Sequence, residues 1–196
     1  MKIVFLTSHS ANNLDVFMSS LKNHQDYCNK HMYTLINCEG PYSVYVDMAL
    51  IKSFFKKDYD IVVIIGTDVL IQKLDNPITA YMPVNSGITM CREIANGNAL
   101  NGDFIIISKS CESDELLTSL QDTQKRFATT QDCLNELQSR IHVSPYLQIA
   151  APSMNPTIDY TKFNLGDYFS VHYHTIGAAP IVSEKAKAMR ADLGVD

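Results

Sequence analysis

Asp60-Ile-Val-Val-Ile-Ile-Gly-Thr-Asp68 is the stretch of the sequence that decides the fold. Five consecutive β-branched residues follow a charged residue and end at Gly66. An unbroken apolar run of this length is typical of a central strand that is covered on both faces. Asp68 follows the strand directly, at the edge where open parallel sheets bind their ligands. The stretch therefore predicts both a buried strand and a polar group at its carboxyl end.

Upstream of this run, the sequence alternates between strand and helix signals. Short apolar runs at residues 3–6 and 33–36 predict two further strands. Apolar residues at helical spacing follow each of them, at Leu14, Phe17, Met18 and Leu21, then at Val44, Met48, Ile51 and Phe55. Strand, helix, strand, helix, strand is the order that builds an α/β fold, so we expect a mostly parallel central sheet flanked by helices.

Downstream of the central strand, the pattern is less regular. Residues 96–102 are rich in asparagine and glycine and predict a loop, and residues 104–107 predict a strand. A leucine-rich helix is expected next, with Ser113 as its N-cap. A late strand at residues 168–174 and a closing helix at residues 183–193 complete the predicted elements.

Composition limits the class of protein. The chain has 196 residues, of which 46% are hydrophobic and 19% charged, a balance that fits one globular domain and excludes a disordered chain. A net charge of −5 argues against a general nucleic-acid binder, although it permits a small basic cleft. The five cysteines form no C-x-x-C pair, so we expect reduced thiols. No apolar run approaches the roughly 20 residues of a membrane span, so we expect a cytoplasmic protein.

Two candidate sites lie at or after predicted strands. Asp68 offers one carboxylate to a hard divalent cation that substrate phosphates also bind, although spacing alone favours a turn aspartate that caps the next segment. His172 and His174 lie two residues apart in the late strand, so both would point to one face and could meet one metal or phosphate. Histidines satisfied within a half-exposed strand are the alternative.

Two further segments are rich in polar side chains. Thr129 and Asp132 have the spacing of a helix capping box, whereas Gln131 and Asp132 at a helix N-terminus could instead orient a hydroxyl or a leaving group. In residues 98–103, glycine permits close backbone approach and Asn101 could bind sugar hydroxyls, but a surface loop accounts for the same residues. The P-loop, dinucleotide and hydrolase-elbow motifs are absent from the sequence.

The first part of the chain contains two recognisable motifs. Residues 23–33 are close to N-x-x-x-Y-C-x-x-H-G-Y, with Met32 in place of the glycine. Residues 60–71 have the form of a strand followed by a D-x-D metal motif. Asp68 is the second aspartate of that motif, and Gly66 stands where the first would be.

The later part of the chain contains three more. Residues 99–107 are close to F-N-x-G-x-x-L-I, with Asp103 in place of the glycine. Residues 130–135 are close to D-Q-D-x-L-N, with Thr130 in place of the first aspartate. Residues 171–173 are close to V-H-F, and the following histidine begins an H-x-x-G spacing.

In this order, over about residues 2–177, the five motifs resemble those of the A-type glycosyltransferases, especially the retaining galactosyltransferase and glycogenin-like families. The resemblance implies a single-domain A-type fold, with a nucleotide-sugar-binding half at about residues 1–75 and an acceptor and catalytic half at about residues 76–196. It implies transfer of a sugar from a nucleotide-sugar donor, such as a UDP-sugar, to a hydroxyl acceptor. Retention of configuration at the anomeric carbon follows from the same resemblance.

The resemblance also implies a role for individual residues. Asp68, with His172 or His174, would hold Mn²⁺ or Mg²⁺ against the diphosphate, and the absence of an aspartate at position 66 would weaken or abolish that binding. The implied donor-binding residues are Thr7, Ser8, Asp68, Asn101 and Lys185, the last being the nearest candidate for a displaced lysine. Gln131 would lie beneath the anomeric carbon and stabilise an oxocarbenium-like state, and Asp132 would bind sugar hydroxyls.

The acceptor is not indicated by any motif. A lipid-linked glycan, a protein and a hydroxylated base in viral DNA all fit a small bacterial or viral enzyme that works in the cytoplasm of a bacterial or host cell. Two other interpretations stay open. The half-missing D-x-D permits a degenerate module that binds a nucleotide or glycan without turnover, and the strand alternation alone permits an unrelated flavodoxin-like or nucleotide-binding α/β domain.

Overall fold

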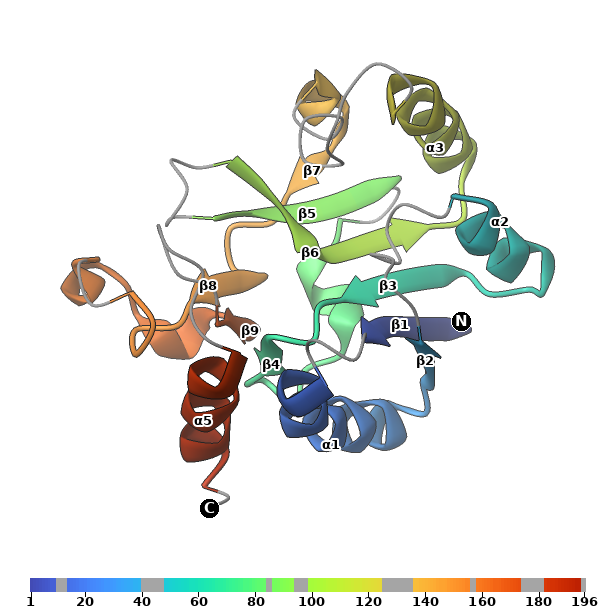
Figure 1. The fold of residues 1–196 in the computed structure, drawn as a ribbon. Coiled ribbons are helices and arrows are strands. Elements are labelled where there is room, and N and C mark those ends of the chain that lie inside the picture. Colours follow the sequence, from blue (N-terminus) through green and yellow to red (C-terminus); the bar gives the residue numbers. More distant parts are fainter. Residues whose placement is uncertain are drawn as a thin grey trace.

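The computed structural model describes residues 1–9, 14–39, 48–83, 86–93, 99–124, 136–155, 158–173 and 182–194. Within them the strands form two sheets (Figure 1). The six-stranded sheet has the order β2-β1-β3-β6-β5-β7, with β1 Ile3–His9, β2 Thr34–Glu39, β3 Ile61–Ile65, β5 Ile88–Glu93, β6 Ala99–Ser108 and β7 His142–Val143. The three-stranded sheet has the order β4-β9-β8, with β4 Val69–Ile71, β8 Gln148–Ala150 and β9 Ser170–His172.

The six-stranded sheet is mixed. β1 pairs in parallel with both β2 and β3, as the alternation of strand and helix predicts. β6 is antiparallel to β3 and to β5, and β7 returns to a parallel pairing with β5. All five residues of β3 are buried, which confirms the central strand predicted from the Asp60–Asp68 stretch.

Helices cover both faces of this sheet, as expected for an α/β fold. The helices of the described residues are α1 Leu14–His31, α2 Met48–Lys56, α3 Cys111–Gln124 and α5 Val182–Leu193, with short 3-10 turns at Ile78–Tyr81, Gln138–Arg140, Tyr160–Lys162 and Leu165–Asp167. Side chains of α2 and α3 share one core cluster with alternate residues of β1 and β3, whereas α1 packs on the opposite face. The small sheet has a cluster of its own with α5, which lies beside α1 (Figure 1).

Two local predictions were wrong. Residues 99–102 belong to strand β6 rather than to a loop, because a register shift between Met90 and Cys91 lets β5 continue to pair with Ala99, Leu100 and Asn101. The N-cap of α3 is Ser110 rather than Ser113. The backbone N–H of each serine donates to the hydroxyl of the other, at 3.0 and 3.1 Å, in a reciprocal capping box.

No helix in the described ranges combines the length and the apolar character needed to cross a bilayer.

Candidate functional site

The site lies where the two sheets meet, after the carboxyl ends of β1 and β3. The β3–β6 pairing extends to Gly66, whose backbone N–H donates to the carbonyl of Asp103 at 2.7 Å. Asp68 follows in the turn that leads into β4, and its carbonyl accepts from the N–H of Tyr173, directly after β9. Asp68 is thus held by backbone contacts to the large sheet on one side and to the small sheet on the other.

Asp68 is a largely buried carboxylate with a fixed ion pair. Its Oδ2 lies 2.6 Å from Nζ of Lys185 in α5, and the two side chains are only 17% and 16% exposed. Burial by itself would raise the pKa of Asp68, but the neighbouring His172 ring and the Lys185 ammonium outweigh it and hold the pKa of this carboxyl below its usual range. Asp68 is therefore ionised at neutral pH.

His172 is buried between two carboxylates. Its Nε2 lies 3.5 Å from Oδ1 of Asp68 and 3.3 Å from Oδ2 of Asp103. The backbone N–H of Asp103 donates to Oδ1 of Asn101 at 2.6 Å, which fixes the orientation of the Asn101 amide and turns its Nδ2 toward Nδ1 of His172 at 3.0 Å. Since an amide nitrogen only donates, Nδ1 accepts, and a neutral ring holds its proton on Nε2, facing the carboxylates.

Gly66 is a position of close approach. A Cβ added there would lie 3.1 Å from Cβ of Asp103 and 3.2 Å from Oδ1 of Asp68. Contacts this short require the neighbours to give by a few tenths of an ångström, so a side chain at position 66 competes for space with the side chain at position 103. Glycine at the first position of the D-x-D motif avoids that shift.

The structure brings four of the predicted site residues together: Asp68, Asn101, His172 and Lys185. Thr7 and Ser8 lie at the same sheet edge, because Leu6 pairs with Ile64 and the next residues of β1 run level with the end of β3.

The other residues predicted for the site include Thr7, Gln131, Asp132 and His174. The hydroxyl of Thr7 is buried and has no hydrogen-bond partner in the described part of the chain. Gln131, Asp132 and His174 lie outside the described residues, as does the predicted capping box at Thr129. Sequence reasoning missed Asp103 as a member of the site, although its place in the F-N-x-G motif was a departure that could have signalled it.

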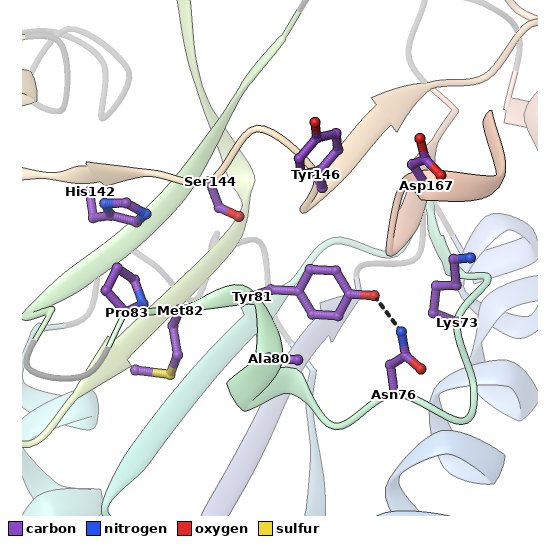
Figure 2. A pocket seen from close by; sticks show the side chains of 10 residues that line it. All are labelled: Lys73, Asn76, Ala80, Tyr81, Met82, Pro83, His142, Ser144, Tyr146 and Asp167. Atoms are coloured by element: carbon purple, nitrogen blue, oxygen red, sulfur yellow. Dashed lines mark hydrogen bonds between the residues drawn. The ribbon is translucent and has the colours of Figure 1, made fainter. Parts of the chain in front are cut away.

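A separate cavity of about 550 Å³ lies at the other end of the small sheet (Figure 2). Its lining includes Tyr81 and Tyr146, and Tyr81 accepts a hydrogen bond from the amide of Asn76 at 2.9 Å. Lys73 after β4 and Asp167 before β9 also line it, whereas Asp68 and His172 lie at the opposite ends of those strands. This cavity is therefore distinct from the site around Asp68.

Solved structures decide the fold, since no family model matches the sequence and no curated protein matches it. A glycosyltransferase involved in glycosylation of the major capsid of PBCV-1 superposes with a TM-score of 0.71, over 97% of this chain and 100% of that one, at 15% identity. The chain has an A-type glycosyltransferase fold. The glycosyltransferase-fold interpretation of the sequence is thereby confirmed, and the flavodoxin-like alternative is wrong.

Two other solved glycosyltransferases share the fold over part of their length. The bifunctional WbbM matches with a TM-score of 0.63 and 14% identity, over 97% of this chain and 50% of its own. GlyE of Streptococcus pneumoniae TIGR4 matches with a TM-score of 0.59 and 11% identity, over 96% of this chain and 60% of its own. This chain thus spans the full length of the capsid-modifying enzyme but only half of WbbM.

Proposed function

We propose that the chain transfers a sugar from a nucleotide-sugar donor to a hydroxyl acceptor, with retention at the anomeric carbon. The observation that carries the proposal is the convergence of Asp68, His172 and Lys185 at the ligand-binding edge of a glycosyltransferase fold. These residues come from distant parts of the chain, and each was picked out by the motif order.

The donor nucleotide would lie over the ends of β1 and β3. Thr7 and Ser8 would contact it there, and the buried Thr7 hydroxyl offers a hydrogen bond that the described residues do not use. Lys185 would place its ammonium next to the diphosphate while it keeps its contact with Asp68, because a flexible lysine can bridge a carboxylate and a phosphate.

The carboxylate of Asp68 suits Mn²⁺ or Mg²⁺. No group of three His, Cys, Asp or Glu side chains within the described residues is arranged to hold a metal ion, so substrate phosphate and water would complete the site. Asp68 is ionised, and carboxylate oxygen together with substrate phosphate is the ligand combination that such hard cations prefer. With the Asn101 amide held as it is, the His172 ring would donate from Nε2 toward the carboxylates. Only the tautomer with its proton on Nδ1 would be a ligand through Nε2, and that form would need the opposite orientation of the Asn101 amide. A bound cation would neutralise charge on the departing diphosphate.

The transfer step divides among the residues of this chain. The bond between the anomeric carbon and the diphosphate breaks with its electron pair on the diphosphate, the acceptor oxygen forms the new bond, and the acceptor proton passes to the diphosphate. Lys185 would stabilise the leaving group, and Asn101 would bind the donor sugar or the acceptor. Gln131 would stabilise the oxocarbenium-like carbon, and Asp132 would bind sugar hydroxyls.

Release of free nucleotide from UDP-, GDP- and CMP-sugars, with Mn²⁺ or with EDTA, tests the proposal. We expect one donor to be turned over with Mn²⁺, and we expect Asp68→Ala to abolish the release because it removes the ionised ligand. Asp75→Ala, which removes an exposed carboxylate paired with Lys30, serves as the matched control and should keep full activity.

Each contrary result has a defined meaning. Full activity of Asp68→Ala with and without EDTA would contradict the cation assignment. Thermal stabilisation by a nucleotide sugar without any nucleotide release would favour a binding module without turnover. With an active donor in hand, a glycan, a protein and hydroxymethylated DNA can be compared as acceptors, and NMR of the product reports the anomeric configuration.

A further inference from the structure

We propose that Asp103 supplies the second carboxylate of the cation site, from strand β6, in place of the side chain that Gly66 lacks. This inference rests on the proposed function, because it names the ligands of a cation that the sugar transfer would use. In the motif comparison, Asp103 is noted only because it replaces the glycine of F-N-x-G.

Geometry is the first support. Asp103 from strand β6 and Asp68 from the turn before β4 approach the same atom, Nε2 of His172, at 3.3 and 3.5 Å. The Asp103 backbone is fixed by two hydrogen bonds, from Gly66 N–H to its carbonyl at 2.7 Å and from its own N–H to Asn101 at 2.6 Å. Backbone contacts therefore hold the two carboxylates near one point, where a cation could meet both.

The space at Gly66 is the second support. A Cβ at position 66 would lie 3.1 Å from the Asp103 Cβ, so the two positions face each other across the antiparallel β3–β6 pair. A carboxylate on either position therefore reaches the same volume beside Oδ1 of Asp68. The chain places that carboxylate on β6 and keeps β3 free of a side chain there.

Charge is the third support. The carboxylates of Asp68 and Asp103 lie beside one ammonium, that of Lys185, so a nucleoside diphosphate placed next to them would face two acidic groups unless a cation lies between them. Asp103 is the more open of the two carboxylates, with 39% of its side chain exposed, so it can meet a cation that arrives with the donor.

Binding of Mn²⁺ alone, followed by electron paramagnetic resonance, tests the assignment without any need for turnover. The unaltered chain should bind one Mn²⁺ at the site, and Asp103→Asn should weaken that binding by about tenfold or more, since it removes a ligand charge while it keeps the shape of the side chain. Asp60→Asn is the matched control, because it removes an exposed carboxylate at the opposite end of β3 and should leave the affinity unchanged.

An exchange of the two positions gives a second test. Gly66→Asp alone should lower the melting temperature, because its Cβ meets Asp103. The double variant Gly66→Asp/Asp103→Gly removes that contact and restores one carboxylate from β3, so we expect it to melt near the unaltered chain and to regain most of the Mn²⁺ affinity lost in Asp103→Asn.

The outcomes separate this inference from the proposed function. Unchanged Mn²⁺ affinity in folded Asp103→Asn, or a folded double variant that does not regain affinity, would overturn the role of Asp103 while donor turnover could still support the transferase. Absence of Mn²⁺ binding to the unaltered chain would also overturn it. Absence of nucleotide release with intact, Asp103-dependent Mn²⁺ binding would support the cation site and count against sugar transfer.

Discussion

At the scale of single residues, His24 shows how a buried titratable group can serve the fold rather than the site. It lies on α1, fully buried, and its Nε2 donates to the carbonyl of Val69 at 2.8 Å. Its Nδ1 has no hydrogen-bond partner among the described residues. Burial lowers the pKa of His24 from 6.5 to about 4, although the bond to Val69 opposes the shift. The His24 ring is therefore neutral in the folded chain at neutral pH.

This histidine makes stability depend on pH in a defined window. Between pH 6.5 and about 4 the unfolded chain binds the His24 proton and the folded chain does not, so the contribution is complete above pH 6.5 and is lost as the pH falls toward 4. The loss is about 3 kcal/mol of unfolding free energy. Urea unfolding at pH 7 and pH 4 should show a smaller difference for His24→Gln than for the unaltered chain, whereas the exposed control His142→Gln should keep the full difference.

At the scale of elements, helix α1 completes the exposed edge of strand β4. The Asn23 side chain donates to the carbonyl of Ile71 at 2.9 Å and accepts from its N–H at 2.8 Å, as a neighbouring strand would. Tyr27, one turn further on, donates from its hydroxyl to the carbonyl of Asn76 at 2.9 Å. Residues of the N-x-x-x-Y-C motif therefore hold helix α1 against strand β4 and the residues that follow it.

Asn23→Leu should destabilise the chain strongly. The substitution keeps the branched shape of the side chain but leaves the N–H and C=O of Ile71 buried without partners, which costs about 2–4 kcal/mol of unfolding free energy. Urea denaturation measures the loss, and Gln25→Ala on the exposed side of the same helix is the control, with an expected change near zero. A loss below about 0.5 kcal/mol in Asn23→Leu would show that water replaces the amide at this edge.

Sequence patterns predicted elements well where burial and periodicity agree. The β-branched run of β3 is set by local composition, so it could be predicted directly. The apolar spacing also predicted helix α1, but not its buried face, because Leu14 and Met18 are exposed and polar residues such as Asn23 are buried instead. Residues 99–102 could not, because asparagine and glycine disfavour a strand locally, and only the pairing with β5 beyond its bulge keeps them extended. The same tertiary contact buries Asn101 and places it on His172.

At the scale of the whole molecule, the site is shared by two sheets of different size. The large sheet contributes Asn101 and Asp103 from β6, a strand of ten residues with a partner on each side. The small sheet contributes His172, from strands of three residues each. Motif order could suggest most of the site residues and could mark Asp103 as a departure from the F-N-x-G motif, but only the register between β3 and β6 shows that Asp103 lies opposite Gly66.

Because the two sheets differ in size, we expect the small sheet to be locally less stable than the large one. Amides of β4 and β9 should exchange with deuterium faster than those of β3 and β6, because short strands open without breaking the main core. Hydrogen–deuterium exchange followed by mass spectrometry makes the comparison, and the donor that is turned over should slow exchange in β4 and β9. Equal rates in both sheets would show instead that the two open only together.

The facing positions 66 and 103 also change how substitutions in such chains should be counted. Because a Cβ at 66 meets the Asp103 Cβ, the two columns of an alignment are one choice rather than two. A comparison with the D-x-D and F-N-x-G motifs that scores each position alone finds two separate departures. Under the proposed role of Asp103, the same two differences would be one exchange, in which the carboxylate lies on β6 instead of at the facing position after β3.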